Sequence, residues 1–179
     1  VPGTAAFVGL SMGGYVALKI ADSAPERVSG LVLCDTRAEP DANENKVKRA
    51  AAIDFVRAHG VDAFLGLFLK DAVGNVQSLE FLRGIAAKSS PEAVMAALAA
   101  LAARPDAVAG LSKIRVPTAI LVGSQDRITP LPLSEAMRSR ILGAELYIIP
   151  DAGHFSNVEN STAFNERLVS FLARLKPVT

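Results

Sequence analysis

The stretch from Phe7 to Tyr15, which reads Phe-Val-Gly-Leu-Ser-Met-Gly-Gly-Tyr, restricts the fold of this chain more than any other stretch. It follows a short apolar run and leads into residues with helical spacing, so it predicts a strand, a tight turn and a helix in direct succession. Ser11 lies between Gly9 and Gly13, and we expect both glycines to be needed because a side chain two residues from the serine would collide where strand and helix pass closely. The serine hydroxyl is therefore expected at the carboxyl end of a strand.

A Gly-x-Ser-x-Gly turn between a strand and a helix is the pattern called a nucleophile elbow. Met12 begins the expected helix, so its backbone N–H has no intrahelical acceptor and points to where an oxyanion would form. The sequence thus predicts Ser11 as a nucleophile and Met12 as a donor of the oxyanion hole. The alternative is a glycine-rich loop without chemistry, which the strand-turn-helix context disfavours.

The composition limits the size of the domain and the kinds of partner and cofactor that we expect. The 179 residues, half of them hydrophobic, can form one domain with a buried core. Nineteen basic and eighteen acidic residues give a net charge of +1, and no basic stripe is present, so we expect a small-molecule partner and neither nucleic acid nor a membrane surface. The single cysteine, Cys34, lies in an apolar run and is expected in the core. We expect no metal and no cofactor, and the lack of a signal peptide or long apolar run predicts a cytoplasmic location.

The order of the expected elements predicts an α/β fold, with a mostly parallel sheet of about four strands flanked by helices. Short apolar runs predict buried strands at residues 4–8, 31–35, 118–122 and 145–149. Helical spacing predicts helices near residues 14–22, 133–142 and 162–175. The first strand, helix and second strand form one unit whose crossover should be right-handed.

Residues 38–110 follow a different pattern, with several helical segments and no convincing strand. Helices are expected near residues 46–59, 62–70, 79–88 and 91–104, the last with Ser90 as N-cap and Pro91 in its first turn. We expect residues 1–37 and 111–179 to form the core domain and residues 38–110 to form a helical cap. The apolar faces of these helices are interpreted as packing faces, or in part as the lining of a pocket over Ser11.

A serine hydroxyl needs a base with a pKa near the working pH, and histidine is the residue for that. The chain has two histidines. His154 follows the last expected strand in a glycine-containing loop, which puts it at the same edge of the sheet as Ser11. His59 ends an expected helix beside Gly60 and has the position of a capping residue. The sequence therefore predicts His154 as the base.

The base needs an acid that orients its second ring nitrogen. Asp126 follows the third expected strand, lies at the same sheet edge and precedes the histidine, so it is the predicted acid. Asp35 also ends a strand and is the rival. Asp151 and Glu159 flank His154 too closely in sequence to approach its ring from behind.

Five motifs together resemble an α/β-hydrolase of the esterase and 3-oxoadipate enol-lactonase type. They are Gly-Leu-Ser-Met-Gly-Gly, Leu-Val-Leu-Cys-Asp-Thr-Arg-Ala, Ala-Arg-Pro-Asp, Val-Gly-Ser-Gln-Asp-Arg-Ile-Thr-Pro and Asp-Ala-Gly-His-Phe, and they run from residue 9 to residue 155. The resemblance implies Ser11 as nucleophile, Asp126 as acid and His154 as base, with the Met12 N–H as one oxyanion donor. Dehalogenases and epoxide hydrolases of this fold carry an aspartate at the elbow, so Ser11 argues against both.

The resemblance implies a serine hydrolase that cleaves small carboxylic esters through an acyl-enzyme. The alternatives are a lactone or enol-lactone hydrolase of the same fold, and a truncated, catalytically impaired fragment. The last is considered because members of this family have several strands before the elbow, and a loop among them supplies the second oxyanion donor.

The resemblance to this family also leads to a prediction about oligomeric state. If the strand at residues 4–8 has no neighbour on one side, its flat, apolar edge can pair with another chain. We therefore expect a homodimer or larger homo-oligomer that forms through this strand.

Overall fold

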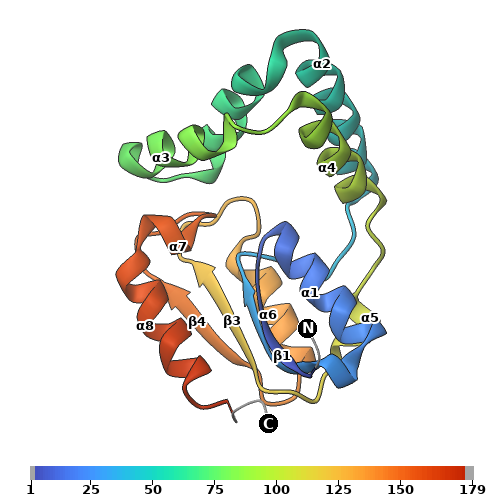
Figure 1. Cartoon of the computed structure of the whole chain (residues 1–179), viewed down its shortest axis with the longest axis vertical. Helices are drawn as coiled ribbons and strands as arrows, with labels where there is room; N and C mark the ends of the chain where they lie inside the picture. The colour runs from blue at the N-terminus through green and yellow to red at the C-terminus, as the bar shows by residue number, and fades with distance from the viewer. Residues whose placement is uncertain (1–2, 176–179) are drawn as a thin grey trace. The chain divides into compact units, whose positions relative to one another are not determined.

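The computed structural model describes residues 3–175, in which four strands form one parallel sheet (Figure 1). The strands are β1 (Ala5–Leu10), β2 (Val28–Cys34), β3 (Thr118–Gly123) and β4 (Glu145–Ile149), and they lie in the order β1-β2-β3-β4. The predicted α/β fold with a four-stranded parallel sheet is confirmed. β1 ends later than the range predicted for it, and β2 begins earlier and ends before Asp35, because their pairing runs from Ala5 beside Val28 to Leu10 beside Cys34.

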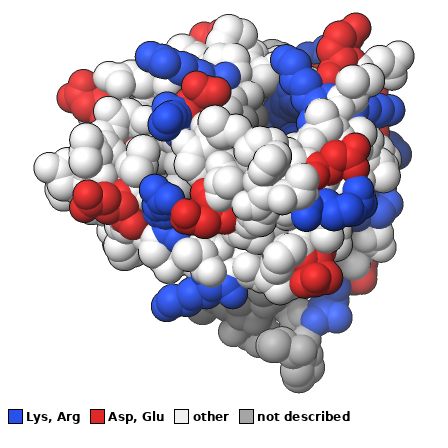
Figure 2. All heavy atoms as spheres, turned by 90° about the horizontal axis from the view of Figure 1, so that it is seen from above, with Lys and Arg blue, Asp and Glu red and all other residues white. Residues whose placement is uncertain are grey.

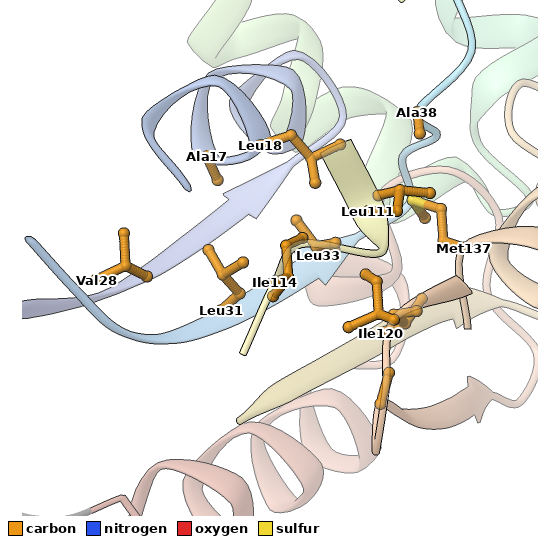
Figure 3. Packing of buried hydrophobic residues seen from close by; sticks show 12 residues of the cluster. Ala17, Leu18, Val28, Leu31, Leu33, Ala38, Leu111, Ile114, Ile120 and Met137 are labelled. Carbon is orange, nitrogen blue, oxygen red and sulfur yellow. The ribbon is translucent and has the colours of Figure 1, made fainter. Parts of the chain in front are cut away.

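Helices cover both faces of this sheet. They are α1 (Met12–Ser23), the 3-10 helix η1 (Pro25–Arg27), α5 (Val108–Leu111), α6 (Leu131–Arg140), α7 (Ser156–Glu159) and α8 (Ser161–Leu172). Because side chains of a strand alternate between its faces, the fully buried Leu31 and Leu33 of β2 pack in one cluster with residues of α1, α5 and α6 (Figure 3). Val32 and Cys34 point the other way, into a cluster with Phe164 of α8. Burial of each of these leucine, valine and phenylalanine side chains stabilises the fold by about 1.5–3 kcal/mol.

The chain divides into two compact units, and one of them, Glu39–Asp106, is helical. It contains α2 (Asn43–Ala72), α3 (Val76–Ala86) and α4 (Pro91–Ala103). α2 is broken at Gly60, whose φ of 80° and ψ of 173° are not helical, and this break separates the two helices predicted near residues 46–59 and 62–70. α4 begins as predicted, since the Ser90 side chain accepts a hydrogen bond from the Ala93 N–H and Pro91 is the first helical residue.

A buried ion-pair network joins the two ends of the helical unit. Asp41, near its start, contacts Arg104, which follows α4, at 3.0 Å, and Arg49 of α2 at 3.1 Å. Arg104 also donates to the Glu39 carbonyl at 3.0 Å. Burial alone would raise the pKa of Asp41, but the two guanidinium groups outweigh it and hold this pKa below its ordinary value. The first and last residues of the helical unit are therefore held together by contacts within the unit.

The surface carries charges of both signs. Lysine and arginine side chains are interspersed with aspartate and glutamate on the face shown in Figure 2. In the described part of the chain no single helix is long and apolar enough to cross a bilayer, although α3 and α4, at 108° to one another, satisfy these two criteria as a bent pair.

β1 forms one edge of the sheet. It pairs with β2, and no other strand among residues 3–175 lies beside it. Val8 of β1 is 48% exposed and Val16 of α1 is 55% exposed. Among the described residues, the outer edge of β1 is therefore apolar and has no strand paired to it.

Candidate active site

The predicted elbow is present between β1 and α1. Ser11 has φ 50° and ψ −111°, a conformation that is strained for a residue with a side chain. Three hydrogen bonds hold it: the Ser11 N–H donates to the Cys34 carbonyl at 2.8 Å, and the Ser11 carbonyl accepts from the Gly14 N–H at 3.0 Å and the Thr36 hydroxyl at 2.8 Å. The contacts from residues at the end of β2 therefore fix the conformation that presents the serine side chain.

The glycines of the elbow differ in how crowded they are. A Cβ at Gly9 would lie 2.3 Å from the Gly13 carbonyl oxygen, and one at Gly14 would lie 2.5 Å from the Thr36 side chain. A Cβ at Gly13 would have no neighbour within 4 Å. The prediction that a side chain would collide on both sides of the serine is correct for Gly9 and wrong for Gly13. The close approach on the helix side is one residue further along, where α1 passes Thr36.

Ser11, His154 and Asp126 form a continuous hydrogen-bonded chain. The Ser11 hydroxyl oxygen lies 2.8 Å from His154 Nε2, and His154 Nδ1 lies 2.9 Å from Asp126 Oδ2. Because an ionised carboxylate only accepts hydrogen bonds, Nδ1 carries the proton and Nε2 is left to accept from the serine. The three residues predicted as the triad follow the carboxyl ends of β1, β3 and β4, and the structure brings them together.

Asp126 is fixed by more than the histidine. Its Oδ1 accepts from the N–H groups of Ile128 and Thr129 at 2.8 and 2.9 Å, and its Oδ2 accepts from the Thr129 hydroxyl at 2.7 Å. Burial raises the pKa of this carboxyl, but the hydrogen bonds and charge of His154 and the hydrogen bonds of Thr129 outweigh burial and leave the pKa below its ordinary value. Asp126 is therefore ionised at neutral pH and held in one orientation.

Thr129 was not identified from the sequence. Its hydroxyl lies 3.3 Å from His154 Nδ1 as well as 2.7 Å from Asp126 Oδ2, so it contacts both partners of the acid–base pair. The Asp-x-x-Thr spacing of residues 126–129 is a signal that could have found it, because an aspartate often accepts hydrogen bonds from residues two and three positions later.

The other acids considered as orienting groups have other places in the structure. Asp35 is completely buried, and its carboxyl oxygens accept hydrogen bonds from Gly123 and Ser156. Glu159 accepts from the Phe155 N–H at 3.2 Å, and Asp151 is exposed. Asp126 is the carboxyl that the structure brings to the histidine.

His59 lies in the helical unit, just before the break at Gly60. Its exposed ring packs against Phe55, with 4.6 Å between the ring centroids. This is consistent with a structural role for His59 at a helix break.

Two further predicted features can be located. Met12 is the first residue of α1, so its N–H has no acceptor within the helix, and it adjoins Ser11 in the chain. Cys34 is completely buried, and burial followed by the charge of Asp35 raises the pKa of its thiol, so the thiolate is disfavoured. Among residues 3–175 no group of three or more histidine, cysteine, aspartate or glutamate side chains is arranged to hold a metal ion.

Comparison with known proteins gives relatives along nearly the whole chain. The family model described as "Alpha/beta hydrolase family" matches residues 1–167. The pimeloyl-[acyl-carrier protein] methyl ester esterase of Neisseria meningitidis serogroup B is 32% identical over 169 residues, covering 88% of this chain and 64% of that relative.

Solved structures give the same result. A thermophilic esterase from Thermogutta terrifontis is 34% identical with a TM-score of 0.91, and the match covers 96% of this chain and 65% of that one. The enol-lactonase from Burkholderia xenovorans LB400 is 26% identical with a TM-score of 0.86, over 96% of this chain and 66% of that one. The chain thus spans between 64% and 66% of the length of these three proteins. A family match that includes the elbow, the parallel sheet and the histidine loop shows that the chain belongs to the alpha/beta hydrolase family.

Proposed function

We propose that the protein hydrolyses small carboxylic esters, with Ser11 as nucleophile, His154 as base and Asp126 as the acid that orients the histidine. The observation that supports this most directly is the pair of hydrogen bonds, 2.8 Å from Ser11 to His154 and 2.9 Å from His154 to Asp126. Nucleophile, base and orienting acid within hydrogen-bond reach of one another are what acyl transfer to a serine requires.

In the first half of the reaction, His154 Nε2 takes the hydroxyl proton as Ser11 Oγ attacks the ester carbonyl. The carbonyl oxygen becomes an oxyanion, and the Met12 N–H at the start of α1 is one donor that stabilises it. The tetrahedral intermediate then breaks its bond to the alcohol oxygen, which leaves with the proton held by His154. An acyl group remains on Ser11.

In the second half, His154 takes a proton from water as the water oxygen attacks the acyl carbonyl. Collapse of the second tetrahedral intermediate releases the carboxylic acid and returns the proton to Ser11 Oγ. Asp126 stays ionised throughout and stabilises the imidazolium form of His154. Residues 38–110, which include the helical unit Glu39–Asp106, are assigned the role of a cap in this proposal.

Lactone hydrolysis is the second candidate, supported by the similarity to an enol-lactonase. Its chemistry at Ser11 is the same, but the leaving alcohol stays tethered to the acyl group. Rates on a short-chain p-nitrophenyl ester and on an enol-lactone, each measured against the Ser11→Ala protein as background, separate the two candidates.

Labelling tests the nucleophile directly. A fluorophosphonate or sulfonyl fluoride should give one adduct, on Ser11, because this serine alone lies 2.8 Å from a histidine nitrogen in the described chain. Peptide mass spectrometry locates the adduct, and the Ser124→Ala protein is the matched control, since Ser124 is an exposed serine in the loop that carries Asp126. An adduct on Ser124 or Ser156 would contradict the proposal, whereas Ser124→Ala should be labelled like the unchanged protein.

We also propose that β1 pairs with β1 of a second copy. The edge of β1 is apolar and uncharged, so a two-fold antiparallel pairing brings no like charges together and also covers the exposed Val8 and Val16. We expect light scattering at micromolar concentration to give the mass of a dimer or a larger assembly. Val8→Lys should shift the protein to monomer because a lysine on an edge strand opposes pairing. A monomeric unchanged protein would refute this pairing.

A further inference from the structure

Asp35 is a second buried carboxylate at the edge of the sheet that carries the triad, and the proposed chemistry does not use it. It follows directly after β2 and has a φ of 45°. Only two other described non-glycine residues have a positive φ, Ser11 and Asp151. Such conformations persist where surrounding contacts impose them, and they gather at functional sites. The contacts of the Asp35 carboxyl group should therefore show why this backbone conformation is present.

Each oxygen of the Asp35 carboxyl has a defined partner. Oδ1 accepts from the Gly123 N–H at 2.8 Å, and Oδ2 accepts from the Ser156 hydroxyl at 2.5 Å and from the Ser156 N–H at 3.4 Å. The exposed fraction of Asp35 is 0%, and so is that of Ser156. Buried hydrogen bonds of this kind are stronger than those at the surface, because no water competes for the donor and the acceptor.

The two partners belong to the two loops that meet at the catalytic histidine. Gly123 ends β3, three residues before Asp126, and Ser156 begins α7, two residues after His154. The Asp35 carboxyl thus bridges the acid loop and the histidine loop from the side of β2. The residues before and after Asp35 bind the elbow that carries Ser11. The Cys34 carbonyl accepts from the Ser11 N–H at 2.8 Å, and the Thr36 hydroxyl donates to the Ser11 carbonyl at 2.8 Å.

The charge of Asp35 is coupled to the triad. The pKa of Asp35 is raised to about 7, mainly because the carboxyl is buried and in smaller part because of the charge of Asp126. Hydrogen bonds from Ser156 and Gly123 and the charge of His154 lower this pKa and so oppose the rise. The titratable groups that face Asp35 are Asp126 after β3, His154 after β4 and the neighbouring thiol of Cys34 in β2. Asp35 therefore titrates near neutral pH, next to two members of the proposed triad.

We propose that Asp35 is a positioning residue, which ties the end of β3 to Ser156 and so holds the His154 ring between Asp126 and Ser11. In the ester hydrolysis proposed above, on which this role depends, Asp35 touches neither substrate nor reacting atoms and acts through the histidine loop. It is not an alternative orienting acid, because both of its oxygens are occupied by Gly123 and Ser156.

The test compares two serine substitutions of equal size and equal burial. Ser156→Ala removes the hydroxyl that donates to Asp35, whereas Ser134→Ala removes a completely buried hydroxyl in α6 that has no hydrogen-bond partner among the described residues. We expect Ser156→Ala to lower kcat between about 10- and 100-fold with KM changed less than about twofold, because a small displacement of a catalytic group costs rate rather than binding. Ser134→Ala should keep the kcat of the unchanged protein.

A second variant supplies a readout that loss of stability alone does not move. Asp35→Asn has the same shape and tolerates a positive φ, but it cannot ionise. Because the pKa of Asp35 is about 7, its titration falls within the pH range of the assay, and the kcat/KM profile of Asp35→Asn should lose the pH dependence that this titration adds. In proton NMR, the downfield signal of the His154 Nδ1–H proton, assigned by its absence in His154→Ala, should broaden or shift in Ser156→Ala and Asp35→Asn and stay unchanged in Ser134→Ala.

Two results would overturn the proposal. One is a kcat for Ser156→Ala equal to that of Ser134→Ala, and the other is an unchanged downfield signal together with an unchanged kcat/KM profile in Asp35→Asn. If the unchanged protein hydrolyses no ester, the proposed function fails. The downfield signal then decides alone whether Asp35 holds the histidine.

Discussion

Asp126→Asn is expected to lower the rate of acyl transfer to Ser11 by about 10⁴-fold. The asparagine would place an amide where Oδ2 now accepts hydrogen bonds from His154 Nδ1 and from the Thr129 hydroxyl. An amide N–H facing Nδ1 makes that nitrogen an acceptor, so the ring proton moves to Nε2. The nitrogen that faces Ser11 then has no lone pair with which to take the hydroxyl proton, and the serine is left unactivated.

Burst kinetics with a p-nitrophenyl ester, or the second-order rate of inactivation by a fluorophosphonate, measures this loss. Asp151→Asn is the matched control, because Asp151 also follows a strand and also has a positive φ, but it is exposed and does not contact the histidine ring. It should keep a rate within about twofold of the unchanged protein, as surface substitutions usually do. A rate for Asp126→Asn close to that of Asp151→Asn would show that Asp126 is not the orienting acid.

The acid loop should survive this substitution. The remaining carbonyl oxygen of the asparagine can still accept from the Ile128 and Thr129 N–H groups, which are now 2.8 and 2.9 Å from Oδ1. The circular dichroism melting curve should therefore change little compared with the effect on rate.

The sheet and the chain order of the site could be predicted because both follow from local patterns. Leu31 to Cys34 is an apolar run, and the structure buries all four side chains completely, two on each face of β2. In a parallel sheet every strand ends at the same edge. Polar residues that follow separate apolar runs, such as Asp126 and His154, were therefore expected together without knowledge of their distance.

Contacts across long separations in sequence could not be predicted in the same way. Asp35 and Ser156 are 121 positions apart, and the sequence marks Ser156 only as one serine among many. The choice between Asp35 and Asp126 as the orienting acid likewise depended on which carboxyl reaches the ring, because both end strands at the same edge. Local pattern identifies the edge at which a residue lies, whereas packing decides its partner.

The elbow shows the same limit at a shorter range. The motif predicts that strand and helix approach closely, but the residues that fill the approach are set by the angle at which α1 leaves Ser11. In the structure the open position is Gly13, and the crowded positions are Gly9 and Gly14, the latter because of Thr36 at the end of a different strand. A rule that treats Gly9 and Gly13 as equivalent misses this asymmetry.

That asymmetry gives the second large expected effect. Gly9→Ala should destabilise the protein by about 3 kcal/mol or more, at the upper end of what overpacking costs. The new Cβ would lie 2.3 Å from the Gly13 oxygen, 2.5 Å from the Gly13 carbonyl carbon and 2.6 Å from the Gly14 nitrogen. All three are backbone atoms, so no side-chain rotation can relieve the clash and β1 must move away from α1. That movement pulls on Ser11, whose backbone lies between the two elements.

Gly13→Ala is the matched control, because it makes the same glycine-to-alanine change on the other side of Ser11. Its Cβ would have no neighbour within 4 Å and its φ is not positive, so alanine fits the existing helix. Replacing a helical glycine with alanine stabilises by roughly 0.5–1 kcal/mol. Urea unfolding midpoints measure both variants, and the two should move in opposite directions. Equal midpoints for Gly9→Ala and Gly13→Ala would mean that a Cβ at Gly9 does not come within 2.3 Å of the Gly13 oxygen. β1 and α1 would then be further apart at the elbow, and their close packing could not be a reason for the strained conformation of Ser11.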